Sequence, residues 1–244
     1  GKTRLVHAIA KALNRQIKTI SLGGVKDASY FLGHGYIYVE SGPGAIVQSL
    51  IDTKCMNPIL YFDELDKVSE VSGGKDIYSF LTYLTDATQN REFGEHYFQG
   101  LKFDLSKMFY IFTFNDITKI DKILLDRINL INVPEPTQQD KCEILYNHCL
   151  PDILQNIGIP IEYNVVEKQH IQDLLRSNKI LCNTPDPAST GVRELYRVLE
   201  AILMEYNKAK ILDNTVQFDF SKFLKKVEQT YNTESSTKIM SMYI

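Results

Sequence analysis

The order of apolar and polar residues along the first half of the chain predicts strands that alternate with helices. Two runs, at residues 59–62 and 108–114, are apolar without alternation, which is typical of parallel strands covered on both faces. Helical spacing or strand-like patterns mark the remaining elements, with helices expected at 2–13, 45–52 and 77–87 and shorter strands at 17–22 and 130–133. This order predicts an α/β core built on a parallel sheet.

The clearest boundary in the chain is the segment Val133-Pro134-Glu135-Pro136. Its two prolines fix φ and favour extended neighbours, so a helix cannot cross it. Thr137 to Asp140 resembles a capping box that opens a helix. The residues beyond it predict a mainly helical part, with further helices at 166–175, 192–209 and 220–231 and a loop at 183–191. We therefore expect a large α/β domain over residues 1–134, a small α-helical domain over 135–231 and a polar tail over 232–244.

Composition and charge restrict the class of protein. Hydrophobic residues make up 44% and charged residues 23% of the 244, which excludes a disordered chain, and no apolar run approaches the roughly 18 residues of a membrane helix. The net charge of −3 argues against a nucleic-acid partner. The four cysteines lack metal-ligand spacing, so we expect reduced thiols in the cytoplasm or an organelle matrix. Because no methionine precedes Gly1, we expect the chain to be part of a longer protein.

The first three residues, Gly1, Lys2 and Thr3, match the end of the phosphate-binding pattern GxxxxGK[ST]. In a complete loop, backbone N–H groups and the helix N-terminus hold the phosphates, the lysine reaches the β- and γ-phosphates, and the hydroxyl binds Mg²⁺. The alternative is a helix that happens to begin with these three residues.

Two adjacent carboxylates, Asp63 and Glu64, follow the first apolar run. They are expected at the carboxyl edge of the sheet, where ligands bind in open α/β proteins. Asp63 can hold Mg²⁺ through water, and Glu64 can polarise the water that attacks a γ-phosphate. The alternative is a solvated strand end whose charges continue into Asp66 and Lys67.

Three more polar residues come later in the chain. Asn115 ends the second apolar run, where its amide could orient the same water, and Arg127 could reach the γ-phosphate of a neighbouring subunit as an arginine finger. Arg193 opens a predicted helix, where a cation is unfavourable unless an anion such as a nucleotide phosphate lies nearby. The alternatives are a turn for Asn115 and an ion pair with a nearby acidic side chain for each arginine.

Over residues 1–210 this sequence resembles the AAA+ ATPase module of Lon-type ATP-dependent proteases. Three segments carry the resemblance beyond the generic ATPase motifs: SLGGVKD at 21–27 with GH at 33–34, YVESGPG at 38–44, and the stretch from QN at 89–90 to FDLSK at 103–107. The resemblance implies a P-loop NTPase core with a helical lid, and ATP and Mg²⁺ as cofactors.

The resemblance also implies a role for each candidate residue. The implied roles are Walker A for Gly1, Lys2 and Thr3, Walker B for Asp63 and Glu64, sensor 1 for Asn115, the arginine finger for Arg127, and sensor 2 for Arg193. Thr3 and Asp63 would be nearest the metal ion.

A pore loop that grips a threaded polypeptide is implied at Tyr38 and Val39. Glu40 replaces the glycine that the family carries in this loop, and Ala45 replaces an arginine. The alternative for residues 36–39 is a plain edge strand.

The predicted function is ATP hydrolysis that drives the unfolding and threading of protein substrates through a hexameric ring of identical subunits, feeding proteolysis. An arginine finger that acts on a neighbour's nucleotide requires such a ring. The chain contains no segment that resembles the Ser–Lys protease domain, so we expect no peptidase activity from it. Two alternatives remain: a remodelling ATPase without a peptidase, and a nucleotide-binding assembly module that does not hydrolyse ATP.

Overall fold

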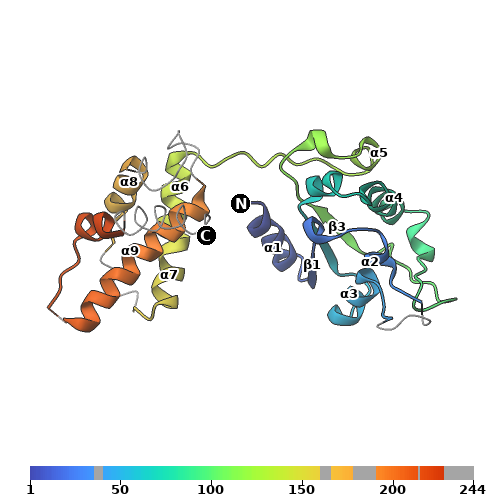
Figure 1. Cartoon of the computed structure of the whole chain (residues 1–244), viewed down its shortest axis with the longest axis horizontal. Coiled ribbons are helices and arrows are strands. Elements are labelled where there is room, and N and C mark those ends of the chain that lie inside the picture. Colours follow the sequence, from blue (N-terminus) through green and yellow to red (C-terminus); the bar gives the residue numbers. More distant parts are fainter. Residues whose placement is uncertain (36–40, 160–165, 178–190, 214, 228–244) are drawn as a thin grey trace, which may run out of the picture. The chain divides into compact units, whose positions relative to one another are not determined.

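The computed structural model describes residues 1–35, 41–159, 166–177, 191–213 and 215–227. The chain divides into two compact units, Gly1–Val133 and Pro134–Ile244, which are described separately (Figure 1). The helices and strands of the first unit are α1 (Lys2–Ala12), β1 (Ile17–Ser21), α2 (Ser29–Leu32), α3 (Ala45–Thr53), β2 (Ile59–Asp63), α4 (Gly74–Thr85), β3 (Phe109–Phe112) and α5 (Lys122–Leu125). Short 3-10 turns follow several of them, at Leu22–Gly24, Leu65–Glu70, Asn90–Glu92 and Ile117–Lys119.

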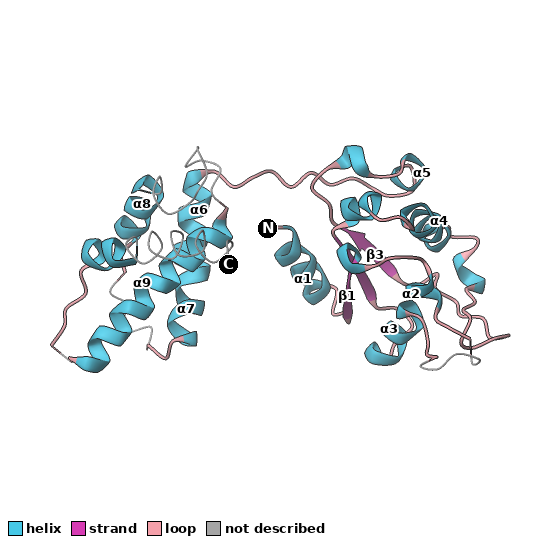
Figure 2. Ribbon diagram, viewed as in Figure 1, coloured by secondary structure: helices cyan, strands magenta, loops and turns pink. Residues whose placement is uncertain are grey.

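The three strands form a parallel sheet in the order β1-β2-β3, shown in magenta in Figure 2. Ile59 of β2 pairs with Ile17 on one side and with Phe109 on the other. The strands are therefore in register, and their carboxyl ends meet at one edge of the sheet. Parallel strands need crossover connections, which α2 and α3 provide between β1 and β2 and α4 provides between β2 and β3. The prediction of an α/β core with a parallel sheet is confirmed.

The two faces of the central strand β2 pack against different helices. Successive side chains of a strand point to opposite faces, and Leu60 and Phe62 belong to the main core together with buried residues of α3 and α4. Tyr61 points to the other face, where its hydroxyl lies 3.4 Å from Thr3 Oγ1 on α1. Residues Ile59 to Phe62 have no exposed surface, which confirms the prediction of a strand covered on both faces.

Two predictions about strands are wrong. Phe109 is 43% exposed and the other residues of β3 are only half-buried, because β3 pairs with β2 alone among the described residues. The run 130–133 forms no strand, and Ile131 is 79% exposed. A strand forms only where its backbone groups find a neighbouring ladder, and the described residues offer this run none.

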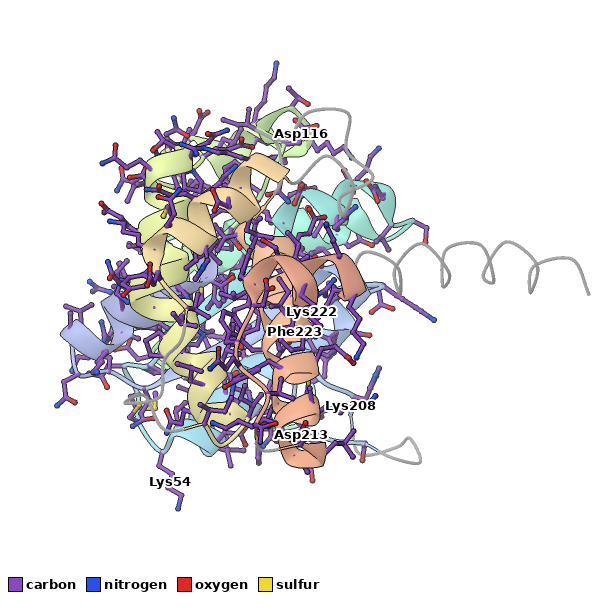
Figure 3. All side chains as sticks on the ribbon, turned by 90° about the vertical axis from the view of Figure 1, so that its left-hand side faces the viewer. Lys54, Asp116, Lys208, Asp213, Lys222 and Phe223 are labelled. Atoms are coloured by element: carbon purple, nitrogen blue, oxygen red, sulfur yellow. The ribbon has the colours of Figure 1, made fainter. Side chains whose placement is uncertain are left out.

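The second unit is helical where it is described. Its elements are α6 (Gln138–Ile144), a π-helical turn (Leu145–Cys149), α7 (Leu150–Asn156), α8 (Lys168–Ser177), α9 (Val192–Leu212) and a helical stretch at 220–227. The predicted capping box is confirmed, because the Thr137 hydroxyl accepts a hydrogen bond from the Asp140 backbone N–H while the Asp140 carboxylate accepts one from the N–H of Thr137. Phe223, labelled in Figure 3, is 3% exposed and belongs to the core of this unit.

None of the helices in the described parts of the chain combines the length and the apolar composition that crossing a bilayer requires.

Candidate functional site

The start of α1 lies beside the carboxyl end of β3. Gly1 is the N-cap of this helix, which has neither a side-chain cap nor an acidic residue in its first turn, so its N-terminal dipole is open to an anion. Lys2 Nζ donates to the Phe114 carbonyl oxygen at 2.8 Å and also to Asn115 Oδ1. The structure therefore brings together Lys2 and Asn115, which are 113 residues apart in the sequence.

A chain of hydroxyl groups joins Thr3 to Asp63. Asp63 Oδ1 accepts a hydrogen bond from Thr113 Oγ1 at 2.5 Å. Thr113 Oγ1 lies 3.1 Å from the Tyr61 hydroxyl, which lies 3.4 Å from Thr3 Oγ1. Since a threonine hydroxyl has one proton and Thr113 gives its proton to Asp63, Tyr61 must donate to Thr113. Asp63 Oδ2 receives no hydrogen bond from the described residues and is available to a cation, for which carboxylate oxygens are preferred ligands.

Glu64 has a left-handed backbone conformation, with φ 62° and ψ 46°. This conformation costs about 1–2 kcal/mol for a residue with a Cβ. It is held by the hydrogen bond that Leu65 N donates to the Thr113 carbonyl at 3.0 Å and by the one that Lys67 N donates to the Glu64 carbonyl at 3.0 Å. The Glu64 carboxylate is exposed and has no hydrogen bond or ion pair with the described residues. A carboxylate without partners is able to accept a proton from water.

Asp66 is a buried carboxylate behind this site. It is 6% exposed, its Oδ2 accepts a hydrogen bond from Asn115 N at 3.3 Å, and its Oδ1 is buried with no partner among the described residues. Asn115 is therefore held by its side chain at Lys2 and by its main chain at Asp66.

Sequence reasoning missed the supporting roles of Tyr61, Thr113 and Asp66. Tyr61 and Thr113 stand inside runs whose pattern indicates only apolar strands, and the sequence places Asp66 only in the alternative of a solvated strand end. The available signal was a hydroxyl side chain within each apolar run, because a buried hydroxyl needs a hydrogen-bond partner.

Arg127 lies in an ion pair within its own unit. Its Nη1 donates to Asp86 Oδ2 at 2.8 Å, and Asp86 directly follows α4. The Thr88 hydroxyl and the Arg127 guanidinium hold the pKa of Asp86 well below its usual range. Within one chain the ion-pair alternative is thus what the structure shows, and no hydrogen bond in the described residues joins Arg127 to Lys2 or Asp63.

The remaining candidates lie elsewhere. Arg193 is exposed in the first turn of α9, next to Glu194, and belongs to the second unit. The predicted pore-loop residues Tyr38 and Val39 lie outside the described residues. The roles of all three stay predictions.

The groups that gather at the carboxyl ends of β2 and β3 fit a nucleotide phosphate with Mg²⁺. They comprise an ammonium group, a hydroxyl, a side-chain amide and two carboxylates, both of which have oxygens without partners among the described residues. Cationic, hydroxyl and carboxylate groups of this kind hold phosphates and their metal ion in phosphoryl-transfer sites.

Comparison with known proteins agrees with this chemistry. The family model for the ATPase family associated with various cellular activities (AAA) matches residues 1–134. The chain is 36% identical to Lon protease 1 of Bacillus subtilis over 87% of this chain and 26% of the relative, and 33% identical to the Lon protease of Campylobacter concisus over 98% of this chain and 29% of the relative. It is also 35% identical to the peroxisomal Lon protease homolog 2 of Arabidopsis thaliana, over 83% of this chain and 22% of the relative.

The chain spans about a quarter of the length of these relatives. The comparisons confirm the predicted resemblance and do not favour a non-hydrolysing module or a remodelling ATPase unrelated to proteolysis. The chain therefore belongs to the AAA family of ATPases, as an ATPase module of the Lon type.

Proposed function

We propose that this chain hydrolyses ATP within a Lon-type protease and uses the energy to unfold polypeptides and thread them toward a peptidase. The observation that carries the proposal is the gathering of Lys2, Asn115, Asp63 and Glu64 at neighbouring strand ends. Residues 1–134 would form the ATPase domain, residues 135–231 its helical lid, and residues 232–244 a polar tail.

Each residue of the site has a defined part in hydrolysis. When bound, ATP with Mg²⁺ supplies the phosphoryl group to be transferred and the cation that neutralises its charge. The Lys2 ammonium has three protons. It donates two of them in hydrogen bonds to Phe114 and Asn115, so one remains for a phosphate oxygen. Thr3 and the free oxygen of Asp63 would hold the metal ion. Glu64 would take the proton of the attacking water, which the Asn115 amide would orient.

The proposed role of Arg127 requires a ring of identical subunits, which we propose to be hexameric. A guanidinium paired with Asp86 in its own subunit lies on the surface, from where it can exchange that partner for the γ-phosphate of a neighbour. Arg193 would contact the nucleotide from the lid. We also propose a reducing compartment, the cytoplasm or an organelle matrix, because Cys55 and Cys142 are free thiols in the described part of the chain.

Threading is tested at Tyr38 in the intact protease. A pore residue must grip a backbone without reading its sequence, and a tyrosine ring provides a large rigid surface for this. Tyr38→Ala should leave basal ATP hydrolysis within about twofold of wild type and abolish degradation of a folded substrate, while short unstructured peptides are cleaved nearly normally.

The matched control for this test is Tyr30→Ala, since Tyr30 is 50% exposed in the same unit and has no proposed role in threading. If Tyr38→Ala instead lowered both the melting temperature and the ATPase rate, Tyr38 would be a packing residue of an edge strand and the threading proposal would be wrong.

A further inference from the structure

The Glu64 side chain lies across the backbone of Gly23. Ser21, the last residue of β1, pairs with Asp63 of β2, so the residues that follow the two strands remain side by side. Gly23 lies in the 3-10 turn Leu22–Gly24 directly after β1. A Cβ atom built on Gly23 would lie 2.5 Å from Glu64 Oε2 and 3.7 Å from its Cδ. The carboxylate therefore occupies the space that a side chain at position 23 would fill.

We propose that Gly23 is a positioning residue for Glu64, and that the absence of a side chain at this position allows the carboxylate to lie where hydrolysis needs it. The inference deepens the proposed function, because it rests on Glu64 as the group that activates water. Gly23 itself would touch neither nucleotide nor water.

The backbone gives no other reason for a glycine at this position. Neither Gly23 nor its neighbour Gly24 has a positive φ, so an L-residue is conformationally allowed at both. The two glycines share one turn but differ in surroundings, since a Cβ on Gly24 would have nothing within 4 Å. Gly24→Ala is therefore a matched control that adds the same methyl group to the same turn without touching Glu64.

An added methyl group at Gly23 should move Glu64 without unfolding the turn. The Glu64 carboxylate is the far end of a flexible, exposed side chain that no hydrogen bond with the described residues holds in place. Ordinary contact begins near 3.4 Å, so Oε2 must retreat by about 1 Å, a displacement that can lower a rate by about 100-fold when the group is catalytic.

The test measures ATP hydrolysis, nucleotide affinity and melting temperature for both alanine variants in the intact protein. Gly23→Ala should lower kcat by about 10- to 100-fold, while the KM and Kd for ATP change less than twofold and the melting temperature does not fall. Gly24→Ala should match wild type in all four quantities. Because a shorter side chain relieves the overlap, Gly23→Ala should cost much less in a Glu64→Asp background than in wild type.

The inference and the proposed function fail in distinguishable ways. If Glu64→Gln abolishes hydrolysis but Gly23→Ala has a normal kcat, the inference alone is overturned. Equal losses in Gly23→Ala and Gly24→Ala, or a loss in Gly23→Ala that the Glu64→Asp background does not reduce, would also overturn it, because the methyl group would then act through the turn. Normal hydrolysis by Glu64→Gln would overturn both.

Discussion

Replacing Thr113 by valine should destabilise the first unit, because this side chain is the central link in the hydroxyl chain of the site. Thr113 is 7% exposed and Tyr61 is fully buried. The hydroxyl of Thr113 donates to Asp63 at 2.5 Å and accepts from Tyr61 at 3.1 Å. Valine has nearly the same shape, so the substitution removes both hydrogen bonds with little change in packing.

The magnitude follows from the two bonds. A hydrogen bond to a charged acceptor contributes about 1.5–3 kcal/mol, and a buried hydroxyl left without a partner costs about 1–3 kcal/mol. Both losses are partly offset, because Asp63 is only half-buried and can recruit water, and because Tyr61 can turn its proton toward Thr3 at 3.4 Å. We therefore expect Thr113→Val to lower the free energy of unfolding by about 2–3 kcal/mol.

Urea denaturation of the wild type and four variants measures this effect: Thr113→Val, Thr113→Ser, Tyr61→Phe and the double variant of Tyr61→Phe with Thr113→Val. Thr113→Ser keeps the hydroxyl and should lose no more than about 1 kcal/mol, the value of one buried methyl group. In a Tyr61→Phe background the Thr113→Val cost should shrink, since no tyrosine hydroxyl is then left unpaired. If Thr113→Val were as stable as Thr113→Ser, or if its cost were the same in the Tyr61→Phe background, the hydroxyl chain would have no energetic role.

Two further predictions concern the backbone and the ion pair. Gly33→Ala should lower the free energy of unfolding by at least about 2 kcal/mol, because Gly33 has φ 70° and ψ −178°, which is nearly restricted to glycine, and its Cβ would lie 2.6 Å from Gly44 N. Gly42→Ala is the control, because a Cβ built on Gly42 would have nothing within 4 Å. Thermal melts of both variants should show an unchanged free energy of unfolding for Gly42→Ala, and equal losses of stability in the two variants would contradict the prediction. Arg127→Ala should lower ATP turnover by about 10³–10⁵-fold if the guanidinium acts on a neighbour's nucleotide. Asp86→Asn should keep its turnover in the same steady-state assay. If the ion pair is purely structural, the two variants should lose ATP turnover equally.

The central strand and its polar end could be predicted from the sequence because their signals are local. The residues from Ile59 to Phe62 are all apolar, and the carboxylates of Asp63 and Glu64 follow directly. Six consecutive residues therefore predict the strand, its burial and the polar side chains at its carboxyl end. The capping box at Thr137 was equally predictable, since its two partners are three residues apart.

The features that the sequence did not predict depend on neighbours far away in the chain. Whether β3 is central or at an edge, and whether 130–133 forms a strand, depends on which backbone pairs with each. The contact between Lys2 and Asn115 joins residues that are 113 positions apart. The Glu64 carboxylate lies beside Gly23 because β1 and β2 are in register. A glycine looks the same in a sequence whether it leaves room for a carboxylate or faces solvent.

The most direct test of ATP hydrolysis at this site is the turnover rate of Glu64→Gln in the intact protein, measured alongside nucleotide affinity. The amide keeps the size of the side chain but cannot take a proton from water, and general-base catalysis contributes about 10²–10⁴-fold. Glu70→Gln is the control, since Glu70 lies in the same 3-10 turn region and pairs with Lys119 at the surface. We predict that Glu64→Gln binds ATP as wild type does and loses about 10²–10⁴-fold in hydrolysis, while Glu70→Gln is unchanged. Hydrolysis by Glu64→Gln at the wild-type rate would contradict the assignment of this site.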